Sequence, residues 1–246
     1  MPRLALATLA VLALAAPAAD AAFDVAWGSS WDGVSLQDIL DDEFGPGVID
    51  AAQDYEGFLP GDADPPYWED ASIKSLVIRE IAGNSNRNTM GWYAEDLLAA
   101  PAIDGVGDGV VIDGGLSAGE NTVVDLPTGL TRFGFYMNPN GPLDAGVNAP
   151  EPEVFYTNRF YNDLGPDGST ALHAPVDGDP QCLIYNVTHL FDGTPTFVLA
   201  WEDLDYGGVL GQQTDNDYND MVVIVQALSP VPNESMTMSS VKALFR

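Results

Sequence analysis

Short β-prone runs separated by turn-forming residues constrain the fold of this chain more than any other feature. From residue 73 onward the runs are rich in valine, isoleucine and aromatic residues, and clusters of Gly, Pro, Asn and Asp lie between them. Such punctuation is typical of all-β domains. We expect strands over residues 73–81, 110–112, 122–126, 132–137, 154–160, 182–188, 196–204 and 221–228. The predicted fold is all-β, a β-sandwich or jelly roll.

One short helix is predicted near the start of this domain, over residues 35–44. Ser35 is a suitable N-cap, and Asp38 lies three residues further on, which is a variant of the capping box. Gly45 and Pro46 end the segment. Its apolar residues fall on one helical face: Leu36, Ile39, Leu40 and Phe44. We therefore expect an amphipathic helix that lies on a sheet.

The first 22 residues are typical of a secretory signal peptide. Arg3 supplies the positive start, residues 4–16 are apolar apart from one threonine, and small residues at 19 and 21 suit cleavage after Ala21 or Ala22. The apolar stretch is too short to span a bilayer. We predict a signal peptide at 1–22, a single domain at 23–228 and a tail at 229–246. The mature chain is then secreted or held at the cell surface, with no membrane span.

The charge balance limits the partners of this chain. It contains 37 acidic residues and 8 basic residues. A nucleic-acid backbone requires a basic footprint, so this excess argues against nucleic acid as a partner. It also argues against anionic membrane surfaces. The acids either solvate the surface or are neutralised by bound cations, and the expected partner is an unidentified extracellular glycan or protein.

The sequence predicts no catalytic site. The two histidines, His173 and His189, have no supporting nucleophile motif nearby, and no GxSxG segment is present. The single cysteine, Cys182, lies in a predicted strand and is expected to be a buried, inert thiol. An extracellular hydrolase that uses a pair of carboxylates is kept as a third hypothesis.

The most informative segment is an acidic hairpin at residues 196–228. Two β-prone runs flank a loop of about 15 residues. Pairing of the runs would bring together six carboxylates and one amide: Glu202, Asp203, Asp205, Asp215, Asp217, Asp220 and Asn219. Clustered carboxylates repel one another unless they are protonated or share a cation.

Calcium is the cation that this ligand set favours. It takes six to eight hard oxygen ligands, including carboxylates and amide carbonyls. Asp215, Asp217 and Asn219 alternate, so in an extended loop they would project the same way, with Glu202 or Asp203 completing the shell. The segment has no Cys or His for soft metals. It is not an EF-hand, because Asp220 and Gln226 replace the required glycine and glutamate. The alternative is a solvated turn whose Asp and Asn residues serve turn propensity.

These motifs resemble a bacterial family of secreted or surface proteins that carries a domain of unknown function. Residues 201–203 read WED and residues 215–220 read DNDYND, which is similar to the C-terminal signature of that family. Weaker similarity covers most of residues 70–228, in EIAG at 80–83, NTMGWY at 88–93, GFY at 134–136 and NPNG at 138–141. The resemblance implies a β-sandwich with a calcium-binding acidic motif and no established activity.

Members of that family often end in a Pro-Glu-Pro sorting tail read by an exosortase. Here Pro232 is followed by Asn233 and Glu234, and no apolar span follows. This departure argues against exosortase anchoring. The predicted function is a calcium-binding structural or adhesive module. A carbohydrate-binding module is the alternative, in which tryptophans would line a sugar face rather than the core: Trp27, Trp31, Trp68, Trp92 and Trp201.

Overall fold

A computed structural model of the chain describes residues 33–56, 68, 72–80, 88–95, 101, 103–114, 118–130, 132–139, 154–162, 181–203 and 216–227. The predicted signal peptide at 1–22 and the predicted tail at 229–246 lie outside these residues and stay predictions. None of the helices within the described residues is both long enough and apolar enough to cross a membrane.

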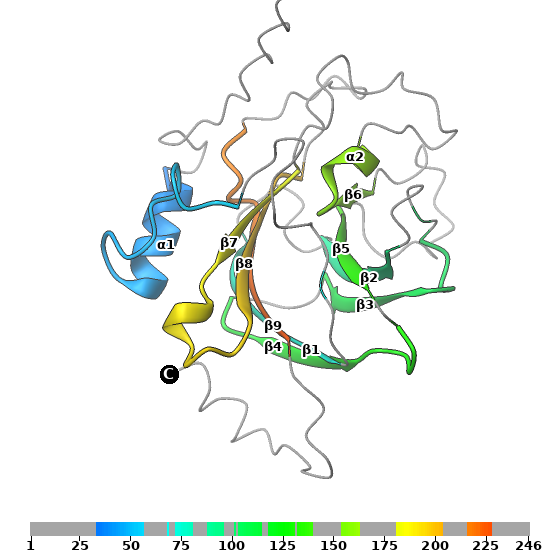
Figure 1. Cartoon of the computed structure of the whole chain (residues 1–246). Coiled ribbons are helices and arrows are strands. Elements are labelled where there is room, and N and C mark those ends of the chain that lie inside the picture. Colours follow the sequence, from blue (N-terminus) through cyan, green and yellow to red (C-terminus); the bar gives the residue numbers. More distant parts are fainter. Residues whose placement is uncertain are drawn as a thin grey trace, which may run out of the picture.

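The described strands form two antiparallel sheets (Figure 1). The five-stranded sheet has the order β4 (Asn121–Asp125), β1 (Ser72–Glu80), β9 (Met221–Ala227), β8 (Thr196–Trp201) and β7 (Cys182–Asn186). The four-stranded sheet has the order β3 (Asp108–Asp113), β2 (Thr89–Ala94), β5 (Phe133–Asn138) and β6 (Phe155–Tyr156). The helical segments are α1 (Leu36–Phe44), α2 (Arg159–Asn162) and the 3-10 turn η1 (Thr188–Leu190). The all-β prediction is confirmed, and the finer sandwich or jelly-roll assignment stays a prediction.

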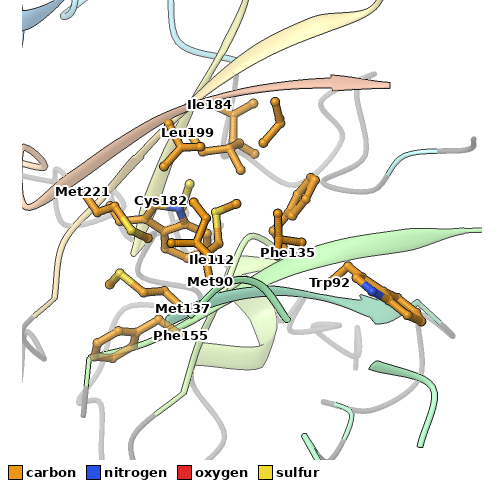
Figure 2. Close-up of a cluster of buried hydrophobic side chains, with 14 of the residues drawn as sticks. Met90, Trp92, Ile112, Phe135, Met137, Phe155, Cys182, Ile184, Leu199 and Met221 are labelled. Atoms are coloured by element: carbon orange, nitrogen blue, oxygen red, sulfur yellow. The ribbon is translucent and has the colours of Figure 1, made fainter. Parts of the chain in front are cut away.

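The two sheets share one apolar core (Figure 2). Side chains of the five-stranded sheet, such as Leu199 and Ile184, point toward side chains of the four-stranded sheet, such as Met90 and Met137. Alternation places Phe133, Phe135 and Met137 on this inner face, as the sequence predicts. Removal of this apolar surface from water is the main source of stability for a chain with a single cysteine.

Three tryptophans and the cysteine belong to this core. Trp92 and Trp201 are buried in it, and the half-buried Trp68 packs against Phe135 with ring centroids 4.9 Å apart. The core interpretation is correct for these three, and Trp27 and Trp31 lie outside the described residues. Cys182 is also buried, and burial raises the pKa of its thiol well above the usual value, as expected of an inert thiol.

Helix α1 covers the outer face of the five-stranded sheet, as predicted. Ser35 caps the helix, because its hydroxyl accepts a hydrogen bond from the Asp38 N–H at 3.1 Å and its own N–H donates to Asp38 Oδ2 at 3.0 Å. Gly45 follows the last turn with φ of 100°, a conformation that favours glycine. The buried face consists of Leu36, Ile39 and Leu40, which join a second cluster with side chains of β7, β8 and β9.

Strand β2 was not among the predicted strands, because glycine interrupts its β-prone pattern. Gly91 lies opposite Tyr136 in the neighbouring strand, and Tyr93 lies opposite Gly134. A Cβ on either glycine would lie 2.3 Å from ring atoms of the tyrosine across from it. Each tyrosine ring therefore lies over a glycine of the neighbouring strand, where a larger side chain would clash with it.

The predicted strand over 154–160 is wrong after its first part. Only β6 is extended there, and α2 follows it. The side chain of Asn162 closes this turn: its Oδ1 accepts a hydrogen bond from the Tyr156 N–H at 2.7 Å, and its Nδ2 donates to the Tyr156 carbonyl at 3.0 Å. These bonds hold the turn on one side of β6, while the Thr157 N–H still donates to the Phe135 carbonyl of β5 at 2.9 Å. The predicted strands 182–188 and 196–204 end earlier, at Asn186 and Trp201.

Candidate metal site

The pairing of β8 with β9 brings acidic side chains together, as the predicted hairpin requires. Trp201, the last residue of β8, lies opposite Met221, the first residue of β9. Glu202 and Asp203 directly follow β8, and Asp220 directly precedes β9. All three are buried, with 1%, 5% and 5% of their surface exposed. One carboxylate oxygen from each lies within 4.8 Å of the others.

Backbone hydrogen bonds hold these three residues in place. The Asp203 N–H donates to Asp220 Oδ2 at 2.8 Å, which ties the end of β8 to the start of β9. The Glu202 N–H donates to the carbonyl of Gln181, next to β7, at 3.1 Å. The site is therefore built on the ends of three neighbouring strands, which are more rigid supports than a free loop.

The electrostatics of the group are unfavourable for three negative charges. Burial raises the pKa of Asp220 well above its usual value, and the nearby carboxylates of Glu202 and Asp203 raise it further. The Asp203 N–H opposes this shift by donating to the ionised form. Such surroundings favour either the protonated form of a carboxyl group or the binding of a cation.

One amide side chain contacts the carboxylates, and two further residues close to the group carry buried amides. Asn88, directly before β2 in the other sheet, points Nδ2 toward Asp203 Oδ2 at 3.4 Å. Its Oδ1 is buried and accepts no hydrogen bond, and the same is true of Gln181 Oε1 and Asn219 Oδ1. Buried polar atoms normally have partners, so three such oxygens on residues near one acidic group are unusual.

The loop before β9 is not extended as expected. Asn216 and Tyr218 have φ values of 56° and 54°, in the left-handed region. Asp217, between them, accepts hydrogen bonds from the backbone N–H and the Nδ2 of Asn219, at 3.2 and 2.8 Å. Asn219 Nδ2 also donates to the carbonyl of Val34, next to α1, at 2.7 Å. A non-glycine residue in the left-handed region is strained and persists only where its surroundings hold it. Tyr218 is held in this way, because it is buried in the second cluster together with side chains of α1.

Of the seven predicted ligands, the structure brings three into one group: Glu202, Asp203 and Asp220. Asp217 and Asn219 are paired with each other at the neighbouring turn, and Asp205 and Asp215 lie outside the described residues. Sequence reasoning missed Asn88 and Gln181. Asn88 is 115 residues from Asp203, and the NTMGWY segment that begins with it gives no indication of a contact with the acidic hairpin.

The spacing of the carboxylates is suited to one hard cation. Calcium–oxygen distances are 2.3–2.6 Å, so two ligands on opposite sides of an ion are about 4.8 Å apart and adjacent ligands are closer. The three carboxylate oxygens meet this limit. The three carboxylates offer oxygen, which is the ligand type of calcium and magnesium rather than of softer metals.

Residues 127–227 match the model of a family described as a domain of unknown function, DUF4114. The match ends at the last residue of β9 and includes all three carboxylates of the site, whereas Asn88 lies before it. It agrees with the resemblance noted above at the level of an uncharacterised domain family. Searches among curated proteins and among solved structures found no significant match.

Proposed function

We propose that this protein is an exported, calcium-stabilised structural or adhesive module. In this proposal a calcium ion is bound by Glu202, Asp203 and Asp220 and joins the end of β8 to the start of β9. The observation that carries it is the burial of three carboxylates within 4.8 Å of one another.

The repulsion within this group gives the ion its energetic role. Two unit charges 4.8 Å apart repel by about 3.5 kcal/mol at an effective dielectric constant of 20. Ionisation of all three groups without a counter-charge would therefore offset a large part of the 5–15 kcal/mol by which proteins are typically stable. A divalent cation between the carboxylates attracts all three, which offsets their mutual repulsion. Its binding free energy then adds to the free energy of unfolding.

Calcium fits the setting better than other hard cations. It accepts variable numbers of carboxylate and amide oxygens, whereas magnesium needs near-ideal octahedral geometry and keeps several waters. The buried amide oxygen of Asn88, on a side chain that contacts Asp203, offers a further oxygen atom near the carboxylates. Extracellular calcium modules bind at roughly 10⁻⁴–10⁻³ M. The predicted signal peptide, the acidic composition and the resemblance to secreted surface proteins support export, and they leave the partner unidentified.

Calorimetric unfolding in EDTA and in calcium tests this function. For a dissociation constant of about 0.1 mM, 10 mM calcium stabilises the folded state by about 2.7 kcal/mol. For a chain of this size that corresponds to a rise in Tm of about 5–11 °C. Asp203→Asn removes one charge from the site and is expected to lose most of this rise. Asp125→Asn, at an exposed position of β4, is the matched control and should keep it. Equal Tm values for the unmodified protein in both buffers would refute the proposal.

A further inference from the structure

We propose that Asn88 is a further ligand of this ion, contributed by the four-stranded sheet, so that the ion joins the two sheets. This inference rests on the proposed function and adds a residue that no motif of the acidic hairpin includes. The residue lies directly before β2, whereas Glu202, Asp203 and Asp220 flank β8 and β9 of the five-stranded sheet.

The hydrogen bonding of the Asn88 side chain is incomplete. The residue has no exposed surface, its Nδ2 contacts Asp203 Oδ2 at 3.4 Å, and its Oδ1 accepts no hydrogen bond. Hydrogen bonds from N–H to oxygen usually measure 2.9–3.0 Å between heavy atoms, so this contact is long. A side chain kept in the core solely as a donor to Asp203 would leave its carbonyl oxygen desolvated without compensation, which is unfavourable.

A rotation of the Asn88 amide would place its oxygen at the spacing expected of a calcium ligand. A rotation of 180° about the Cβ–Cγ bond exchanges the positions of the oxygen and the nitrogen. The χ2 torsion of asparagine has a broad distribution, so both orientations are accessible. The oxygen then occupies the place of Nδ2, 3.4 Å from Asp203 Oδ2. Two oxygen ligands at right angles, each about 2.4 Å from calcium, are separated by about 3.4 Å. The amide therefore already lies at the spacing of an adjacent ligand.

The cation and the amide orientation are linked in this scheme. Without the ion, the carboxylates attract the N–H₂ end of the amide, which is the observed orientation. With the ion, positive charge at the centre repels that end and attracts the carbonyl end. Coordination by Asn88 would place ligands from both sheets around one ion, so calcium would stabilise the packing of the sheets as well as the β8–β9 end.

Terbium luminescence of the full chain, purified after export, tests this assignment. Terbium substitutes for calcium, is sensitised by nearby aromatic residues such as Trp201, and its decay in H₂O and D₂O reports the number of bound waters. Asn88→Ala is expected to weaken terbium and calcium affinity at least tenfold and to add one bound water. Asn88→Asp places a carboxylate oxygen at the same position and should bind at least as tightly as the unmodified protein. Thr89→Val, at the next buried position, is the control for local disturbance and should leave the water count unchanged.

The outcomes separate this inference from the proposed function. If the unmodified protein binds neither terbium nor calcium, both are wrong. If it binds, and Asp203→Asn weakens binding while Asn88→Ala changes neither affinity nor water count, the inference alone is overturned. An aspartate variant as weak as the alanine variant would also overturn it.

Hydrogen exchange provides a second test that does not depend on the folding of a variant. In the unmodified protein, calcium should slow amide exchange at the start of β2 as well as near Asp203 and Asp220. Slowing confined to the ends of β8 and β9 would overturn the role of Asn88, because an ion bound there by the five-stranded sheet alone would not order β2.

Discussion

Replacement of Asp220 by asparagine is expected to stabilise the metal-free protein and to abolish its response to calcium. The two side chains have nearly the same shape, and the asparagine oxygen can still accept the hydrogen bond that the Asp203 N–H donates at 2.8 Å. The variant therefore removes a charge from the buried group while keeping the contact that joins the two strand ends.

The expected gain follows from the spacing of the group. At 4.8 Å and an effective dielectric constant of 20, each repulsion with Glu202 or Asp203 amounts to about 3.5 kcal/mol when both groups are ionised. The raised pKa of Asp220 favours its protonated form, which lowers the repulsion, so the measurable gain is smaller. We expect about 2 kcal/mol in EDTA at neutral pH, a little over half of one such repulsion. This corresponds to a rise in Tm of about 4–8 °C.

The pH dependence has a definite sign. Burial and the two neighbouring carboxylates raise the pKa of Asp220 in the folded state above its unfolded value. Its protonated form is therefore favoured by folding, and the associated stability is complete below the unfolded pKa and is lost as pH rises through the folded pKa. In EDTA, the advantage of Asp220→Asn over the unmodified protein should grow as the pH is raised over this range.

Thermal unfolding of both proteins, in EDTA and in 10 mM calcium, measures these effects. In EDTA, the variant is expected to have the higher Tm. Calcium is expected to raise the Tm of the unmodified protein and to leave that of the variant unchanged. Asp125→Asn should resemble the unmodified protein in every buffer, because this exposed side chain lies at the end of β4. A variant that is less stable than the unmodified protein in EDTA would refute the electrostatic reasoning.

Two further predictions concern the framework that supports the site. Ser35→Ala removes the hydroxyl that caps α1 and should lower the free energy of unfolding by about 1 kcal/mol in denaturant titrations, with calcium affinity unchanged. A large loss of calcium affinity would contradict the expectation that the helix cap does not contribute to the metal site. Gly134→Ala places a methyl group 2.3 Å from the buried ring of Tyr93 and should cost about 1–3 kcal/mol in the same titration, whereas an unchanged midpoint would show that the ring can move aside.

Local patterns in the sequence were sufficient for most of the secondary structure. The capping box at Ser35 and the alternation of Phe133, Phe135 and Met137 depend on neighbours within a few residues, so both predictions are confirmed. Prediction failed where a distant or unusual contact decided the backbone. Strand β2 contains a glycine that lies under a tyrosine of the neighbouring strand, and the turn after β6 is closed by bonds between the Asn162 side chain and the Tyr156 backbone.

By itself, the sequence determined that this is an all-β chain with an acidic hairpin, and it predicted which strand ends carry the carboxylates. Those properties follow from periodicity and from pairing between segments close in the chain. The tertiary structure alone decided which oxygens meet. Left-handed residues at 216 and 218 direct Asp217 toward Asn219, and the packing of two sheets brings Asn88 to Asp203 across 115 residues. The ionisation energy of a buried group of carboxylates is set by its desolvation, by nearby charges and by hydrogen bonds. Several of these contributions come from residues that are distant in the sequence.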